Sequence, residues 1–160
     1  MNKHRIKLDK NTLILLVLAI AWMTVIFFFS SQPGEDSARQ SGRVVELLLG
    51  IFNRVYNHHP PAFIVDWLLK SDHFVRKGGH VAEYMVLGVL VINLLKRWDL
   101  KKYFIISLSV CFIYASSDEV HQLFVPGRAG RVSDVLLDTA AALVGMGIVA
   151  GLRRVRKPGL

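Results

Sequence analysis

Four apolar runs dominate this sequence and restrict the folds that are open to it. They cover residues 13–29, 79–95, 103–117 and 135–152 of the 160-residue chain. A helix needs about 20 residues to cross the hydrocarbon layer of a membrane, and about 17 are enough. The runs have 17, 17, 15 and 18 residues, and in the middle two we expect neighbouring polar residues to lengthen the helix. The sequence therefore predicts an all-α fold, a single-domain polytopic membrane helix bundle over residues 1–160 with four transmembrane helices.

Basic residues flank these runs and indicate the orientation of the chain. Three clusters of four contain 12 of the 20 Lys and Arg residues. The clusters are Lys3, Arg5, Lys7 and Lys10; Lys96, Arg97, Lys101 and Lys102; and Arg153, Arg154, Arg156 and Lys157. Cytoplasmic loops carry such an excess of positive charge, whereas a nucleic-acid-binding face gathers it on one surface. We predict a multi-pass protein of the bacterial cytoplasmic membrane with both termini in the cytoplasm and no nucleic acid as a partner.

The first apolar run also has the basic start and apolar core of a signal peptide. The run is long for that role, and the residues FFFSSQPGED at its end contain no A-x-A-like cleavage site. We therefore expect an uncleaved membrane anchor.

The loop after this anchor contains two further helical patterns. Residues 36–57 carry apolar side chains at helical spacing and charged side chains elsewhere around the turn, a pattern typical of a helix on the membrane surface. Pro60 and Pro61 end this pattern. Residues 62–69 (AFIVDWLL) suit a second short piece with Trp67 at headgroup depth. We predict one or two interfacial helices in the first outer loop.

Polar residues from all four runs converge at one end of the predicted bundle. They are Ser30, Ser31 and Gln32; Arg76, Lys77, His80, Glu83 and Tyr84; Ser116, Ser117, Asp118, Glu119, His121 and Gln122; and Arg131, Ser133, Asp134 and Asp138. The inner ends carry only cationic anchors. Because ionisable groups are costly beside hydrocarbon, this asymmetry predicts an outward-facing polar site on the outer face of the membrane.

Helical spacing arranges these residues further. Positions 76, 80 and 83 share one stripe, and positions 118, 121 and 122 share another. Asp138 lies one turn after Asp134, about 6 Å deeper. A carboxylate at that depth needs a partner or a proton, and three arginines and two histidines are available: Arg76, Arg128, Arg131, His80 and His121.

Several of these features also have structural interpretations. Asp134 or Ser133 suits the N-cap of the last helix. The glycines at 145, 147 and 151, with Ala141 and Ala150, suit a close helix-packing face that serves one bundle or a dimer, so the oligomeric state stays open. The two histidine–carboxylate stripes could be ion-pair networks between helices.

The spacing does not support a metal, and we predict no cofactor. Cys111 is the only cysteine and lies within an apolar run. His80 and His121 come from different helices without an H-x-x-x-H pair, and His58 and His59 precede a double proline in a polar loop. A divalent metal stays an alternative, because histidines and carboxylates gather at one end.

Three sequence blocks resemble the VanZ-like family of bacterial integral membrane proteins, first known from a glycopeptide-resistance gene cluster. They are FSSQPGEDS at residues 29–37, RKGGHVAEYMVLG at 76–88 and YASSDEVHQLFVPGRAGRVSDVLLDT at 114–139. The third block is the specific one, and residues 42–72 carry little family signal. The resemblance implies a several-span helical fold, a role in the cell envelope and a link to teicoplanin resistance, but it supplies no reaction.

Three hypotheses for the function follow. The first is an enzyme, a transferase or hydrolase for a lipid or cell-wall headgroup at the outer leaflet, because histidines, carboxylates and phosphate-binding arginines converge. Its candidate catalytic residues are His80, Glu83, Asp118, Glu119, His121, Asp134 and Asp138. Its candidate substrate-binding residues are Ser31, Gln32, Arg76, Lys77, Tyr84, Gln122, Arg128 and Arg131. The second is a non-catalytic protein that binds or shields an envelope lipid, a cell-wall precursor or a glycopeptide. The third is a transporter or proton relay, for which no polar path continues inward. Membrane lipids are the expected partners in the first two.

Overall fold

The computed structural model describes residues 9–56, 60–70, 72–98 and 102–155, and in these ranges the chain is helical without strands. The helices are α1 (Lys10–Ser30), α2 (Gly34–Tyr56), α3 (Ala62–Lys70), α4 (Asp72–Arg97), α5 (Tyr103–Gln122) and α6 (Val132–Val155). Several residues discussed above lie outside the described ranges: Lys3, Arg5, Lys7, His58, His59, Lys101, Arg156 and Lys157. The side chains of Trp67 and Arg154 are also not described.

Four of these helices are long and apolar enough to cross a membrane, which confirms the predicted helical membrane bundle. The candidate spans are Lys10–Ser30, Phe74–Arg97, Tyr103–Gln122 and Val132–Arg153. The second and third spans include the polar residues next to their apolar runs, as the sequence predicted. Many large apolar side chains of these helices are exposed, as expected for surfaces that face lipid. The protein is a multi-pass membrane protein.

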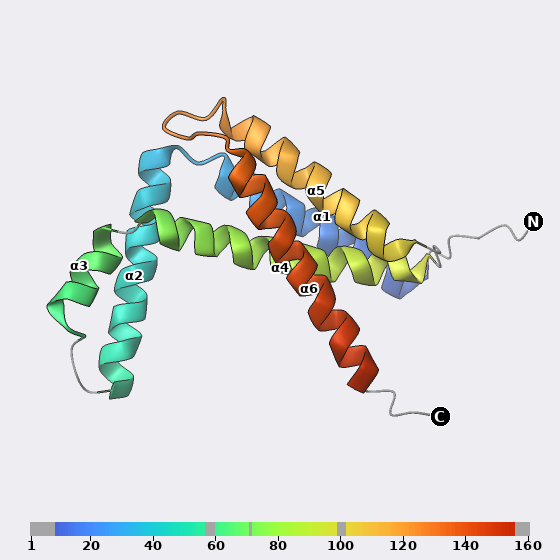
Figure 1. The fold of residues 1–160 in the computed structure, drawn as a ribbon, viewed down its shortest axis with the longest axis horizontal. Coiled ribbons are helices and arrows are strands. Elements are labelled where there is room, and N and C mark those ends of the chain that lie inside the picture. Colours follow the sequence, from blue (N-terminus) through green and yellow to red (C-terminus); the bar gives the residue numbers. More distant parts are fainter. Residues whose placement is uncertain (1–8, 57–59, 71, 99–101, 156–160) are drawn as a thin grey trace, which may run out of the picture.

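Helix α4 lies at the centre of the bundle and contacts α1, α2, α5 and α6 (Figure 1). Helix α6 crosses α4 steeply, and the two backbones approach closely at Gly88 and Gly145. A Cβ atom at Gly88 would collide with the carbonyl of Ala142, and one at Gly145 with the carbonyl of Met85. The expected packing role therefore holds for Gly145, whereas Gly147 and Gly151 face open space. Around this crossing lies a core that includes Tyr84, Leu87, Cys111 and Met146.

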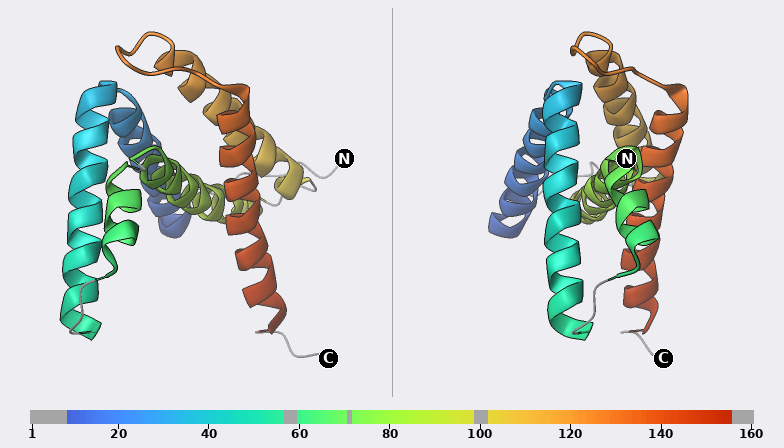
Figure 2. Two further views of the ribbon diagram at one scale, coloured as in Figure 1. Left: turned by 60° about the vertical axis from the view of Figure 1, so that its left-hand side comes forward. Right: turned by 90° about the vertical axis from the view of Figure 1, so that its left-hand side faces the viewer.

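Helices α2 and α3 lie at one end of the bundle. Both views of Figure 2 show α2 running steeply across the beginning of α4. Helix α2 begins two residues before the predicted start, because Gly34 fits tightly against the turn between α5 and α6. The Gly34 N–H donates to the Pro126 carbonyl over 3.0 Å, and Gly127 adopts a left-handed φ of 71°. A Cβ atom at Gly34 would collide with the Gly127 carbonyl.

The ends of the four spans divide into two groups. The last turns of α1 and α5 and the first turns of α4 and α6 gather near the α5–α6 turn, and we call this the polar end (Figure 1). The first described turn of α1 and the last described turn of α6 lie at the opposite end. There Arg97 binds Asp9 over 3.1 Å, and Arg153 Nη2 donates to Asn93 Oδ1 over 2.5 Å. Hydrogen bonds from Thr12 hold the pKa of Asp9 below its ordinary value.

Candidate functional site

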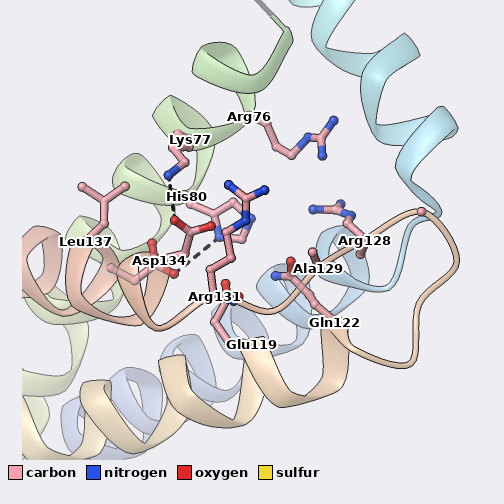
Figure 3. A pocket seen from close by; sticks show the side chains of 12 residues that line it. Arg76, Lys77, His80, Glu119, Gln122, Arg128, Ala129, Arg131, Asp134 and Leu137 are labelled. Atoms are coloured by element: carbon pink, nitrogen blue, oxygen red, sulfur yellow. Dashed lines mark hydrogen bonds and ion pairs between the residues drawn. The ribbon is translucent and has the colours of Figure 1, made fainter.

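A cavity of about 140 Å³ lies at the polar end, between α4, α5, α6 and the α5–α6 turn (Figure 3). Charged side chains form most of its wall. Its lining residues are Arg76, Lys77, His80, Glu119, Gln122, Gly127, Arg128, Ala129, Arg131, Asp134, Leu137 and Asp138. Of the fifteen candidate catalytic and substrate-binding residues predicted from the sequence, nine therefore surround one cavity.

At the floor of the cavity, His80 faces Asp138. The two side chains come from α4 and α6, and 3.6 Å separates His80 Nδ1 from Asp138 Oδ2. Asp138 is 1% exposed, and neither of its carboxylate oxygens has a hydrogen-bond partner among the described residues. Burial of a carboxylate without hydrogen bonds is costly, so groups of this kind are rare in proteins and call for an explanation. The sequence predicted that a buried Asp138 needs a partner, and His80 is the residue that lies beside it.

One turn toward the mouth of the cavity, Lys77 binds Asp134. Lys77 Nζ donates to Asp134 Oδ1 over 2.7 Å (Figure 3). Ser133 Oγ donates to the same oxygen over 3.2 Å. Helix α6 begins at Val132, so Ser133 and Asp134 both lie in its first turn, and neither is the N-cap that one interpretation expected. A carboxylate in the first turn is still stabilised by the helix dipole.

Glu119 joins α5 to the start of α6. Its Oε2 accepts the backbone N–H of Arg131 over 2.8 Å, directly before the first residue of α6. Gly130 allows this approach, because a Cβ atom there would collide with the carbonyl of Glu119. Glu119 therefore satisfies an N–H at the helix start that would otherwise lack a partner.

Arg128 connects the α5–α6 turn to the end of α1. Its Nε donates to the carbonyl of Gln32 over 3.1 Å, and its Nη2 donates to the carbonyl of Phe29 over 3.0 Å. The guanidinium groups of Arg76, Arg128 and Arg131 point into the same space (Figure 3). Burial, together with the nearby Arg76, lowers the pKa of Arg128 from its ordinary value. The mouth of the cavity is therefore a cationic environment.

A second polar cluster lies between α1 and α5, and of its three residues only Gln122 also lines the cavity. Ser30 Oγ donates to Asp118 Oδ2 over 2.7 Å. Gln122 Nε2 lies 3.1 Å from Ser30 Oγ and 3.3 Å from Asp118 Oδ2. All three side chains are buried. We call them the Ser30–Asp118–Gln122 cluster. Asp118 turns toward α1 and does not line the cavity.

His121 also turns toward α1. Its Nε2 lies 3.1 Å from Ser31 Oγ, and its ring lies 4.6 Å from that of Phe27. The Ser31 hydroxyl donates to the carbonyl of Phe27 over 2.7 Å, so it accepts from Nε2 of His121. His121 therefore belongs to the packing of α5 on α1 and does not line the cavity.

Four further predicted site residues also lie outside this wall, each for a local reason. Ser31 and Gln32 directly follow α1, and their side chains bind carbonyls of that helix, at Phe27 and Phe28. Tyr84 is fully buried in the core beside His80, with a ring-centre distance of 6.5 Å. Glu83 faces a different groove, between α2 and α4.

Three lining residues were not singled out from the sequence: Gly127, Ala129 and Leu137. Leu137 lies three residues after Asp134, and helical spacing therefore offered a signal for it. Gly127 and Ala129 flank Arg128, and nothing in their residue type indicates a site. Among the described residues, no group of three or more His, Cys, Asp or Glu side chains is arranged to hold a metal ion.

Comparison with known families identifies the chain. The VanZ/LLP1 family model matches residues 15–153, which include every residue of the cavity wall. Comparisons with curated proteins and with solved structures give no match. The resemblance that the three sequence blocks indicated is confirmed, and the chain belongs to the VanZ/LLP1 family of membrane proteins.

Proposed function

We propose that the protein is an enzyme that acts on the phosphate-bearing headgroup of an envelope lipid or lipid-linked cell-wall precursor. The observation that carries the proposal is the cavity itself. It places His80 against a buried carboxylate, Asp138, and surrounds them with cationic side chains. A general base and phosphate-binding groups thus share one small space.

The charges of the wall favour an anionic ligand. Three arginines and one lysine line the cavity, against the three carboxylates of Glu119, Asp134 and Asp138. With His80 neutral, one positive charge is in excess. The planar guanidinium donates two parallel hydrogen bonds to a phosphate, which suits Arg76, Arg128 and Arg131 for this role.

The proposed chemistry is transfer or hydrolysis at phosphorus. Asp138 faces Nδ1 of His80 and so favours the tautomer with the proton on Nδ1, which leaves Nε2 as the base. Nε2 accepts the proton of a hydroxyl or water nucleophile as its oxygen bonds to phosphorus. The bond from phosphorus to the leaving oxygen breaks, and protonated His80 returns the proton to that oxygen. Arginines stabilise the charge of the phosphoryl oxygens during this exchange.

We place the polar end on the outer face of the bacterial cytoplasmic membrane and both termini in the cytoplasm. The support is the distribution of basic residues, since Lys96, Arg97 and Arg153 lie at the opposite end of the bundle. In this orientation the cavity meets headgroups of the outer leaflet, where glycopeptides act. Lowered teicoplanin susceptibility is accordingly the phenotype that we attach to the site.

Replacement of the proposed base tests the function. We expect His80→Ala and Asp138→Asn to abolish the teicoplanin phenotype and to change the amount of one extracted lipid. Thr139→Val is the matched control, because Thr139 follows Asp138 on α6 and its hydroxyl donates to the Val135 carbonyl of the same helix. Full phenotype in correctly inserted His80→Ala and Asp138→Asn variants would sink the enzyme proposal.

The second candidate is a protein that binds the same headgroup, or a glycopeptide, without chemistry. The fixed position of Arg128 favours it, since two hydrogen bonds to α1 hold this guanidinium ready for an anion. For a binder, Arg131→Lys should be milder than Arg131→Ala, and His80→Ala should have little effect. Detection of any product from a candidate lipid rules this function out.

A further inference from the structure

A second, larger groove borders the cavity at the polar end. It has a volume of about 460 Å³ and lies mainly between α2 and α4. Its wall is mostly apolar or small, with Phe29, Val44, Leu48 and Val75 among its residues. It shares three residues with the cavity: Arg76, His80 and Arg128. An apolar groove and a cationic cavity thus meet at the proposed base.

We propose that this groove holds a hydrocarbon chain of a membrane lipid while the phosphate of the same lipid lies in the cavity. The proposal deepens the proposed function and rests on it, because it assumes that the cavity takes an anionic headgroup. It specifies that the ligand is a lipid rather than a soluble phosphate.

The shape of the groove supports a chain as its occupant. Gly78 and Gly79 form part of the α4 wall, and a Cβ atom added to either would meet nothing within 4 Å. The absent side chains therefore leave room along α4. On the opposite wall, Val44 and Leu48 of α2 are 45% and 55% exposed, so the groove continues into the apolar surface of the protein. A chain can enter sideways from the membrane.

Charge complementarity sets the direction of the lipid. The cationic groups are those shared with the cavity. The rest of the groove has the apolar side chains of Phe29, Val44, Leu48 and Val75, together with Ser37, Gln40, Ser41 and Glu83. A phosphate beside Arg76 and Arg128 leaves its chain directed along the groove. Because the interior of a membrane is as apolar as the groove, the chain gains little from burial itself. The function of the groove is to let the headgroup reach His80 without placing the chain in polar surroundings.

Another apolar groove, between α5 and α6, also borders the cavity, at Glu119 and Arg131. It does not include His80 in its wall, whereas the α2–α4 groove does. A lipid that enters between α2 and α4 therefore passes the proposed base first.

A photolabelling experiment tests the proposal on the full chain in phosphatidylcholine vesicles. The probe is a phosphatidylglycerol with a photoreactive diazirine in one acyl chain, and soluble glycerol phosphate is the headgroup-only probe. We expect adducts on α2 and α4 near Val44, Leu48 and Val75. Gly79→Leu should fill the groove and remove these adducts, while glycerol phosphate still binds. Gly147→Leu is the matched control, because a Cβ atom there also meets nothing within 4 Å and Gly147 lines none of the cavities described above.

The possible results distinguish an error in the α2–α4 groove from an error in the headgroup site. Unchanged adducts in Gly79→Leu, or adducts on α5 and α6 instead, overturn the α2–α4 groove and leave the headgroup site standing. If the wild-type protein binds neither the photoreactive lipid nor glycerol phosphate, the headgroup site is overturned, and the groove with it. Gly78→Leu serves as a second groove-filling variant if Gly79→Leu does not insert into the membrane.

Discussion

The two histidine–carboxylate neighbourhoods at the polar end differ in how their polar atoms are satisfied. In the Ser30–Asp118–Gln122 cluster, Oδ2 of Asp118 has two donors, whereas its Oδ1 has none among the described residues; His121 nearby is bound to Ser31. In the cavity, Asp138 has a histidine at 3.6 Å and no hydrogen bond among the described residues. Both carboxylates are buried, at 3% and 1% exposure.

This difference distinguishes a cluster that joins two helices from the cavity for which we propose chemistry. A hydrogen-bonded polar cluster between two helices fixes how they pack, since breaking it would leave buried groups without partners. A buried carboxylate beside a histidine and an open cavity lowers stability, and such groups gather where function requires them. The chain thus uses similar residues for assembly between α1 and α5 and for proposed chemistry between α4 and α6.

The largest expected effect is on activity, at His80. General acid–base catalysis contributes about 100-fold or more to a rate, so His80→Ala should lower lipid turnover by that factor. His121→Ala should leave turnover within about threefold of wild type, because His121 does not line the cavity. Turnover is measured from the extracted lipids of cells that produce equal amounts of each variant. Equal losses in both variants would erase the distinction between the two neighbourhoods.

The next effect is on stability, at Asp118. Asp118→Ala removes the acceptor of Ser30 Oγ and Gln122 Nε2, which should lower the free energy of unfolding by about 1–3 kcal/mol. Thermal unfolding in detergent measures the change. Ser117→Ala is the control on the same helix, because the Ser117 hydroxyl is exposed and binds the carbonyl of Tyr114. An Asp118→Ala variant as stable as this control would show that the cluster does not hold α1 on α5.

For Asp138, we expect a substitution to raise the free energy of unfolding rather than lower it. Asp138→Ala removes a buried carboxylate without hydrogen bonds, and a neutral His80 leaves no charge unpaired. We expect the free energy of unfolding to rise by about 1 kcal/mol while activity is lost, as stability and function oppose each other at such sites. The same melting experiment applies. Destabilisation as large as that of Asp118→Ala would assign Asp138 a structural role.

The smallest effect is expected at Ser31. Ser31→Ala removes one hydrogen bond to His121 in a part-buried position, which is worth about 0.5–1 kcal/mol. Activity should be unchanged because neither residue lines the cavity. Melting temperature and lipid turnover measured on one preparation check both statements. A loss of turnover without a loss of stability would return His121 to the list of catalytic candidates.

The fold could be predicted from the sequence more completely than the site. Apolar runs of membrane-spanning length and the amphipathic pattern before Pro60 gave the spans and α2, because each signal is local. Helical spacing also placed Asp118 and Gln122 on one stripe, and they do contact each other. The spacing could not tell which helix that stripe faces. Whether a carboxylate turns toward α1 or toward the cavity depends on the steep crossing of α4 and α6, which Gly88 and Gly145 permit and no local pattern reveals.

The contact of Arg128 with the end of α1 has a consequence for biosynthesis. The carbonyls of Phe29 and Gln32 leave the ribosome early, and the guanidinium that binds them follows 99 and 96 residues later. The cavity also requires α6, which is translated after that. A nascent chain therefore lacks the complete cavity while its first three spans enter the membrane. The proposed activity requires insertion of the last span, because only then does Asp138 lie beside His80.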